Sequence, residues 1–414
     1  MSDMAIPTRS PSMFWGATII CGTVVGAGMF VLPVVMAGAW FGWALLILTF
    51  SWICMLISGL MFHRVSQHYP LETGYDKIVR DVLGRNWAEI NGLSLVFVLG
   101  ILTYAYISAV GPVYDHSLSI LTGKTVSSSE AKIMLSLTVA AIVWLGTSSI
   151  GRMMSVLLIT KIVLLLILFG GLFTTVNVDY LLDNQNPAAS YWPYMLGIVP
   201  FCLASFGYHG NISGLISYYN GDHRRVKRCL CTGTAVALVI YLFWIICTMG
   251  NLPRSAFPEI AAQGGDIAAL MHAFSLRGYS AGMSLLFSTF SHFAVICSFV
   301  GVTAGLVDYI SDRFNFPATR TGRLKATAIT FLPPLSLSLL FPDGFVTAIG
   351  YAGLIATIWA VIVPGLLHLK MRSRQDSGYR RGQWDGLQLS MIIVFAALNI
   401  LSWALSEFDL LPVY

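Results

Sequence analysis

Long stretches without a single charged side chain recur along this chain, and they determine its architecture. Between Arg9 and His63 no Asp, Glu, Lys or Arg occurs. That run is long enough for two membrane helices of about 20 residues each, with a turn at 38–42. Further uncharged stretches lie at 90–114, 133–151, 162–178, 184–221, 229–253, 278–307, 326–342, 344–369 and 386–406. The pattern predicts eleven membrane spans.

Composition agrees with this pattern. Only 10% of the 414 residues are charged and 56% are hydrophobic, with a mean hydropathy of +0.75. A water-soluble domain of this size needs a far more polar surface. Since no soluble domain longer than about 30 residues remains between the spans, residues 1–414 are predicted to form one membrane domain. The sequence contains no phosphate-binding G-x-x-x-x-G-K-[ST] motif, so any active transport must draw on an ion gradient.

The basic residues map the topology. With the N-terminus inside the cell, twenty of the 24 Lys and Arg residues fall on the cytoplasmic side. Because short cytoplasmic loops carry an excess of Lys and Arg, this bias predicts a cytoplasmic N-terminus and a periplasmic C-terminus. The basic run at 224–228 is explained by the same rule and needs no nucleic-acid or lipid-headgroup partner.

Two predicted spans contain glycine-rich interruptions near mid-membrane. Span one holds the glycines of 22–28 with Pro33 five residues later, and span six holds Pro200 followed by 205–210. A broken helix is tolerated in lipid only where it is buried in protein or lines a cavity. The freed N–H groups suit a carboxylate and the freed carbonyls suit an ammonium group. Breaks five spans apart predict two inverted five-helix repeats that hold a zwitterionic substrate, and therefore a transporter.

Aromatic and titratable residues lie near these breaks. The aromatic side chains are Tyr104, Tyr106, Phe206, Tyr208, Phe293 and Tyr351, which suit a flat aromatic substrate, although aromatic residues of membrane helices often only pack. Lys161 lies about 13 Å into span five, counted at 1.5 Å per residue, which is too deep to reach the interface easily. A lysine buried there could lose and regain a proton during transport. His209, inside the second break, could bind substrate or relay a proton.

Several of these segments resemble one known family, the hydroxy and aromatic amino acid permeases of the amino acid–polyamine–organocation superfamily. The matching segments are 22–30 with Pro33, 102–108, 200–211, 301–309, 348–353 and 410–412, and the likeness covers essentially the whole chain. Within the family, Thr103-Tyr104-Ala105-Tyr106 and Phe201-Cys202-Leu203-Ala204 are most similar to the tryptophan-specific branch. His292 departs from the pattern, because the family has a small polar residue there.

The resemblance implies an all-α fold with eleven transmembrane helices: a five-plus-five inverted repeat (LeuT-like), with helices 1 and 6 broken, and one extra C-terminal helix. The predicted repeats are 13–174 and 192–370, followed by helix 11 at 386–406. In proton-coupled relatives a lysine of the fifth helix occupies the place of a sodium ion, and Lys161 matches that position. The predicted substrate-binding residues are Thr23, Val25, Gly26, Ala27, Gly28, Tyr104, Ser108, Ser205, Phe206, Gly207, Tyr208, His209, Phe293 and Tyr351, and the predicted proton-coupling residues are Lys161 and His209.

The function implied is proton-coupled import of an aromatic amino acid, tryptophan first, across a bacterial inner membrane. The predicted partners are that amino acid, protons and membrane lipid, with no nucleic acid, metal or cofactor, and the chain is predicted to act as a monomer. Tyrosine or broad aromatic specificity is the alternative within this class. A channel or receptor subunit is the alternative from another class. A membrane enzyme is disfavoured, because the spans contain no H-E-x-x-H or G-x-S-x-G motif.

Overall fold

In a computed structural model, every regular element among the described residues is a helix. The described residues are 12–26, 28–71, 73–122, 125–145, 147–184, 186, 189–278, 281–317, 319–373 and 382–414, and the side chains of 110–122, 147–155, 281 and 284 are left aside. The longer helices are α3 (Trp40–Ser66), α5 (Arg85–Thr122), α6 (Ser128–Leu145), α7 (Thr147–Phe173), α11 (His223–Met249), α14 (Ala281–Arg313), α15 (Arg320–Leu340) and α18 (Asp385–Glu407). Shorter helices join or interrupt them.

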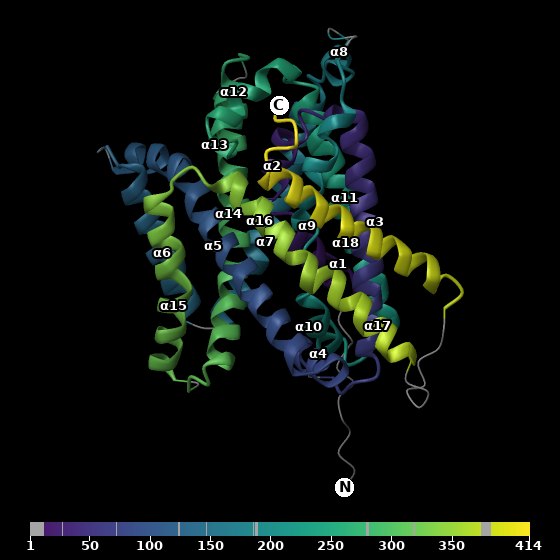
Figure 1. The fold of residues 1–414 in the computed structure, drawn as a ribbon. Helices are drawn as coiled ribbons and strands as arrows, with labels where there is room; N and C mark the ends of the chain where they lie inside the picture. The colour runs from purple at the N-terminus through teal and green to yellow at the C-terminus, as the bar shows by residue number, and fades with distance from the viewer. Residues whose placement is uncertain are drawn as a thin grey trace.

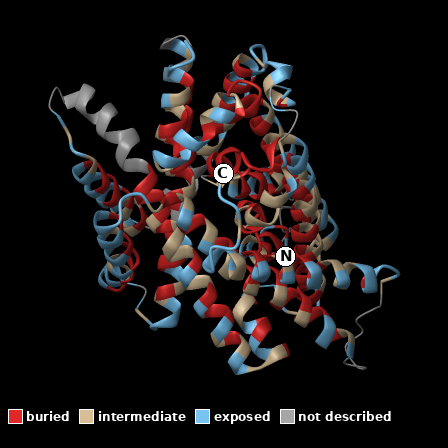
Figure 2. Ribbon diagram, turned by 45° about the horizontal axis from the view of Figure 1, so that its top comes forward, coloured by how far each residue is buried: buried red, intermediate tan, exposed pale blue. Residues whose placement is uncertain are grey.

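Eight helices in the described part of the chain are long and apolar enough to cross a membrane. The bent pair α1 (Met13–Val24) and α2 (Gly28–Val35) makes a ninth span if it is taken as one. Many apolar side chains of these helices point outward, for example Leu166 at 65% exposure and Leu285 at 69%. Figure 2 shows the buried residues gathered in the interior of the bundle and the exposed ones along its outer faces. This outer apolar surface confirms the prediction of a multi-pass membrane protein.

The helices are arranged in an upright bundle (Figure 1), in which helices distant in sequence lie together. α1 packs along α11, and α14 packs along α7 and α5. α16 (Phe345–Thr357) lies between α5 and α9 (Val199–Ser205), while α6 and α15 stand side by side at the edge of the bundle. The C-terminus lies at the end that carries α8 (Val178–Leu181) and α12 (Phe257–Ala262). The opposite end carries α4 (Tyr75–Leu83) and α10 (Asn211–Tyr218).

The turn predicted at 38–42 comes slightly earlier, because α3 already begins at Trp40, whose φ is +55°. Arg254 holds this turn from the side, donating to the carbonyls of Ala37 at 3.0 Å and Gly38 at 2.8 Å. The same guanidinium lies 3.5 Å from a carboxylate oxygen of Asp183, and it is buried. A buried cation with these acceptors fixes the outer end of α2 to the loops around it. Arg254 belongs to the 3₁₀ turn η3 (Arg254–Ala256), and a further helix, α13 (Ile267–Ser275), follows α12.

The helix after α16 is irregular in a way that serves its neighbours. A π-helical turn, η4 (Ile358–Ile362), joins α16 to α17 (Val363–Ser373). Its carbonyls accept hydrogen bonds from other helices: Trp359 accepts from the Tyr75 hydroxyl and Ala360 from the Ser58 hydroxyl. Because π turns shift the register of a helix, they often occur near functional sites.

The predicted span at 184–221 is divided into short pieces. Two 3₁₀ turns, η1 (Trp192–Tyr194) and η2 (Leu196–Ile198), lead into α9, and α10 continues the path after an interruption. Pro200 stands near the start of α9, where a missing backbone N–H costs nothing. The interruption predicted at 205–210 is therefore present in the structure.

Candidate functional site

The first break separates α1 from α2. α1 ends at Val24, and α2 begins at Gly28 after a bend of 50°. The Val25 N–H still donates to the Cys21 carbonyl at 2.8 Å, and the Met29 N–H donates to the Gly26 carbonyl at 3.2 Å. Among the described residues, no backbone carbonyl accepts from the N–H of Gly26 or Gly28. Those two N–H groups start the second half of the span and are oriented as in other anion-binding helix N-termini.

Lys161 reaches the first break from α7. Its ammonium donates to the carbonyl of Val25 at 2.6 Å and to that of Gly22 at 3.2 Å. The side chain is 2% exposed. A buried ammonium must have hydrogen-bond acceptors, and carbonyls left without helical donors supply them. The lysine that the sequence analysis singled out therefore lies directly against the interruption.

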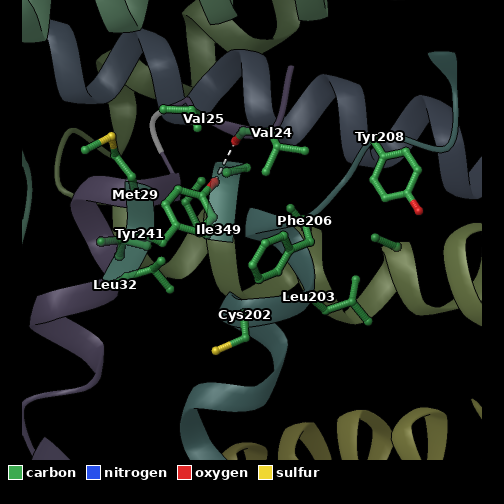
Figure 3. Packing of buried hydrophobic residues seen from close by; sticks show 14 of the residues in the cluster. Val24, Val25, Met29, Leu32, Cys202, Leu203, Phe206, Tyr208, Tyr241 and Ile349 are labelled. Carbon is green, nitrogen blue, oxygen red and sulfur yellow. Dashed lines mark hydrogen bonds between the residues drawn. The ribbon is translucent and has the colours of Figure 1, made fainter. Parts of the chain in front are cut away.

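The second break separates α9 from α10. α9 ends at Ser205, and α10 begins at Asn211. Figure 3 shows Phe206 turned into the buried cluster, whereas Tyr208 projects away from it. The Phe206 ring lies edge-on to Tyr241, with centroids 5.3 Å apart. This break is thus anchored by side chains that its own residues send in different directions.

Tyr208 and His209 pack against α3 and η4, not against the first break. The Tyr208 hydroxyl donates to the Met55 carbonyl at 3.1 Å. His209 is fully buried, stacks on Tyr208, and has Nε2 3.2 Å from the Ser58 hydroxyl. Of the described polar atoms around it, none lies within hydrogen-bond range of His209 Nδ1. Both side chains hold the second break to its neighbours, and the proposed roles in substrate binding and proton relay stay predictions.

Tyr241 of α11 joins the two breaks. Its hydroxyl lies 2.6 Å from the Val24 carbonyl and 2.8 Å from the Ser205 carbonyl, as Figure 3 shows for Val24. A phenol has one proton, so it donates to only one of these carbonyls at a time. A second link is the Asn211 amide, which donates to the Thr23 hydroxyl at 2.6 Å. The two interrupted helices are therefore connected directly.

The space beside Gly26 is lined by α5 and α14. A Cβ atom on Gly26 would lie 2.6 Å from Ser298 Oγ and 3.4 Å from the Tyr106 hydroxyl. Tyr106 in turn stacks on Phe299, with centroids 5.9 Å apart. Within the described part of the chain, the buried hydroxyls of Ser298 and Ser108 have no hydrogen-bond partner. Orphaned buried hydroxyls next to free N–H groups form a site that a polar ligand would satisfy.

The other predicted residues fall into two groups. Gly28 packs on Ser205, so these two predicted positions meet where the breaks touch. Phe293 is half-buried on α14, one helical turn before Cys297. Ala27 lies outside the described residues.

Tyr104 and Tyr351 are not brought to the breaks. They line a separate pocket between α5, α15 and α16, and the Tyr104 hydroxyl donates to the Phe341 carbonyl at 2.7 Å. Tyr106 takes the position beside Gly26 that was predicted for Tyr104. Two residues along a helix turn a side chain by about 200°, which explains the exchange.

Sequence reasoning missed three residues of this region, namely Tyr241, Asn211 and Ser298. Tyr241 and Asn211 carry no signal in a single sequence, because a tyrosine or asparagine in a span is usually packing. Ser298 follows Ser291 by seven residues, and both lie in α14. A repeat of seven places small polar residues on one helical face, and this pattern could have indicated it. Across the described residues, no group of three His, Cys, Asp or Glu side chains could hold a metal ion.

The fold and the site define a class: a helical membrane transporter with two interrupted spans. Two solved structures share this fold. A manganese transporter from Eremococcus coleocola, solved with an aromatic bis-isothiourea compound, gives a TM-score of 0.66 at 13% identity, covering 97% of this chain and 90% of that one. MhsT in complex with L-phenylalanine gives 0.62 at 14% identity, with 94% and 97% covered.

Sequence comparison identifies the particular family. The model of the tryptophan/tyrosine permease family matches residues 9–403. The tryptophan-specific transport protein of Shigella flexneri is 46% identical over 100% of both chains, and the low affinity tryptophan permease of Escherichia coli K12 is 40% identical over 100% of this chain and 99% of that one. The tyrosine permease of Enterobacter agglomerans is 38% identical over 99% of each chain. This chain belongs to the tryptophan/tyrosine permease family, whose members are transporters and not enzymes.

Proposed function

We propose that this permease imports an aromatic amino acid, tryptophan first, by proton symport across the bacterial inner membrane. Relatives named for tryptophan transport, at 40% to 46% identity over nearly their whole lengths, support this substrate. The relative named as a tyrosine permease, at 38% identity, keeps tyrosine as the alternative. The substrate enters from the periplasm and leaves to the cytoplasm.

The proposed topology has eleven spans. It consists of an inverted repeat at 13–174 and 192–370 with an eleventh helix at 386–406. The two interrupted spans, α1 with α2 and α9 with α10, would each open one repeat, which supports this division. The N-terminus is then cytoplasmic and the C-terminus periplasmic. In support, the C-terminus lies at the opposite end of the bundle from α4 and the basic loop before α11.

The amino-acid backbone is proposed to lie between the breaks. The N–H groups of Gly26 and Gly28 would receive the carboxylate, and the carbonyls of 206–208 would receive the ammonium group. The side chain would then lie against Tyr106 and the hydroxyls of Ser108 and Ser298. The hydroxyls offer partners to an indole N–H, and the tyrosine ring offers a stacking face.

The single observation that carries the coupling proposal is the position of Lys161 on the first break. Its ammonium donates to two carbonyls that a helix would otherwise satisfy. Loss of the proton removes the charge and one donor, so the hold on Val25 and Gly22 weakens. The interrupted helix is then free to move relative to α7. We propose that protonation from outside and deprotonation to the cytoplasm drive this change once per cycle.

Uptake in proteoliposomes tests this function. Radiolabelled tryptophan is offered under an imposed proton gradient without sodium, to wild type, Lys161→Met and Lys132→Met. Lys132 is the matched control, because it is also buried and donates to a backbone carbonyl, that of Ser338 at 3.1 Å, but on α6. Wild type and Lys132→Met should accumulate tryptophan, while Lys161→Met should lose gradient-driven accumulation by about a hundredfold or more.

Each outcome separates the hypotheses. Accumulation that requires sodium, or that persists in Lys161→Met, removes the coupling role of Lys161. Non-saturable flux that ignores the gradient indicates a channel. Saturable uptake of tyrosine that tryptophan does not inhibit identifies tyrosine as the substrate.

A further inference from the structure

A second cavity lies away from both breaks, on the face of α5. Its volume is about 670 Å³, and α5, α14, α15 and α16 form its walls. It contains Tyr104 and Tyr351, the two aromatic residues that the structure separates from the transport site. This volume is within the range of pockets that hold small organic ligands.

The helix α15 brings unsatisfied polar groups to this cavity. It contains Pro333 and Pro334, neither of which has a backbone N–H. The carbonyls four residues earlier, those of Ile329 and Thr330, therefore lack the donor that an α-helix would supply. Both of these residues line the cavity.

Thr330 adds a hydroxyl to the same place. The residue is 1% exposed, and among the described residues its Oγ1 has no hydrogen-bond partner. Thr327, one turn earlier, is satisfied by the Arg323 carbonyl at 2.9 Å. An orphaned hydroxyl beside two underused carbonyls is costly unless a ligand donates to it, because buried polar groups are almost always paired.

The remaining lining determines which ligand suits the cavity. It contains no Asp, Glu, Lys, Arg or His, so an ion would find no partner there. Apolar side chains at the edge are open to the surroundings, with Phe97 at 45%, Leu337 at 47% and Phe341 at 62% exposure. In a membrane these residues face acyl chains, so the occupant arrives through the lipid.

We propose that this cavity binds an uncharged amphiphile whose apolar body fills the space between α15 and α16 and whose hydroxyl or N–H group donates to the acceptors at Ile329 and Thr330. The site is separate from the transport site. On α16, Tyr351 faces this cavity while Gly350 packs on the Phe201 ring of α9. Binding here therefore does not depend on the transported substrate or on the ion that drives uptake.

Photolabelling of the full-length protein in lipid nanodiscs tests the proposal. The probes are dodecan-1-ol with a mid-chain diazirine and the methyl ether of the same molecule, which keeps the apolar body and lacks the donor. Labelled peptides are located by mass spectrometry. The alcohol should label 329–341 and 344–351 saturably, excess dodecan-1-ol should displace it, and the ether should label about three- to tenfold less, as expected for one hydrogen bond.

Three variants sharpen the result. Thr330→Val keeps the shape and should lower labelling by the alcohol about three- to tenfold, whereas Thr327→Val should leave it unchanged. Thr347, an exposed residue of the lining, allows Thr347→Trp to fill the cavity and block both probes without disturbing the core. Equal labelling by alcohol and ether, or labelling that excess alcohol fails to displace, would overturn the proposal and indicate an ordinary lipid contact. Persistent labelling in Thr347→Trp would overturn it as well, and it does so even if Thr330→Val fails to fold.

Discussion

The two helix breaks are built from similar glycine-containing segments but are stabilised differently. At the first break, the carbonyls of Gly22 and Val25 are held by the ammonium of Lys161, which can gain or lose a proton. At the second break, the Ser205 carbonyl lies 2.8 Å from the hydroxyl of Tyr241, which bears no charge, and Tyr208 is bonded to the backbone of α3.

This difference assigns different tasks to the two breaks. A charged donor that can be removed makes a contact that responds to a proton gradient. A neutral hydroxyl does not respond in this way. The first break is therefore the coupled element, and the second is the fixed side against which it moves. Tyr241 transmits between them, because its one proton serves either the Val24 or the Ser205 carbonyl.

The largest expected effect comes from the glycines. Gly26→Val places a Cβ atom 2.6 Å from Ser298 Oγ, so we expect a loss of uptake of about a hundredfold. The nearest atom to a Cβ on Gly207 is the Ala204 carbonyl oxygen at 3.5 Å, an ordinary contact, so Gly207→Ala should keep uptake within about threefold of wild type. Tryptophan uptake per inserted protein measures both. Normal uptake by Gly26→Val would contradict the close packing of the first break.

Tyr241→Phe should have the next largest effect. Removing its hydroxyl leaves two buried carbonyls without this donor, which costs about 1–3 kcal/mol. We expect uptake to fall about tenfold and the melting temperature in detergent to drop. Tyr69→Phe is the control, since the Tyr69 hydroxyl bonds Asp81 at an exposed position far from the breaks in sequence. A Tyr241→Phe protein that transports like wild type would mean that the breaks move independently.

His209→Gln tests the comparison from the other side. The histidine packs on Tyr208 and Trp359 with neutral partners, so its replacement should lower uptake about threefold through lost packing. The shape of the pH profile of uptake should not change. A shifted profile would instead support the proton-relay role predicted from the sequence and would make the second break a coupled element too.

The smallest effect concerns a carboxyl group outside the spans. Asp266 caps α13 by accepting from the Ala269 N–H at 2.9 Å, and its neighbour Gly265 packs on Val34 at the outer end of α2. Burial raises the pKa of Asp266 from 3.8 to about 6. The folded protein then binds this proton more tightly than the unfolded chain, so the stabilisation is complete below about pH 4 and is lost as the pH rises to about 6.

Asp266→Asn keeps a capping oxygen and removes this titration. Relative to wild type, the variant should gain about 1–3 kcal/mol of stability between about pH 4 and pH 7. Thermal unfolding in detergent at the two pH values measures the difference. An equal pH dependence in both proteins would show that Asp266 does not titrate in this range, and would leave Lys161 as the group to test at the end of α2.

Much of the fold was predictable because lipid imposes simple rules. Uncharged stretches predicted the membrane helices, and the glycines of 22–28 and 205–210 predicted where two of them are interrupted. The boundaries were less predictable: the turn came at Trp40 and not at Gly42, because Arg254 fixes the carbonyls of Ala37 and Gly38 from a distant loop. The π turn η4 had no sequence signal at all.

The site was predictable only in part. The sequence by itself determined that an ammonium group must lie at membrane depth in α7, since Lys161 is too far from the nearest interface to avoid burial. It also determined the family, because its motifs are long and continuous. Only the tertiary structure decided that Tyr106 and not Tyr104 faces Gly26, that Tyr208 and His209 turn toward α3, and that Tyr241 joins the breaks. The physical reason is that spacing along a helix specifies relative directions of side chains, whereas the neighbour that each direction meets depends on how the helices pack.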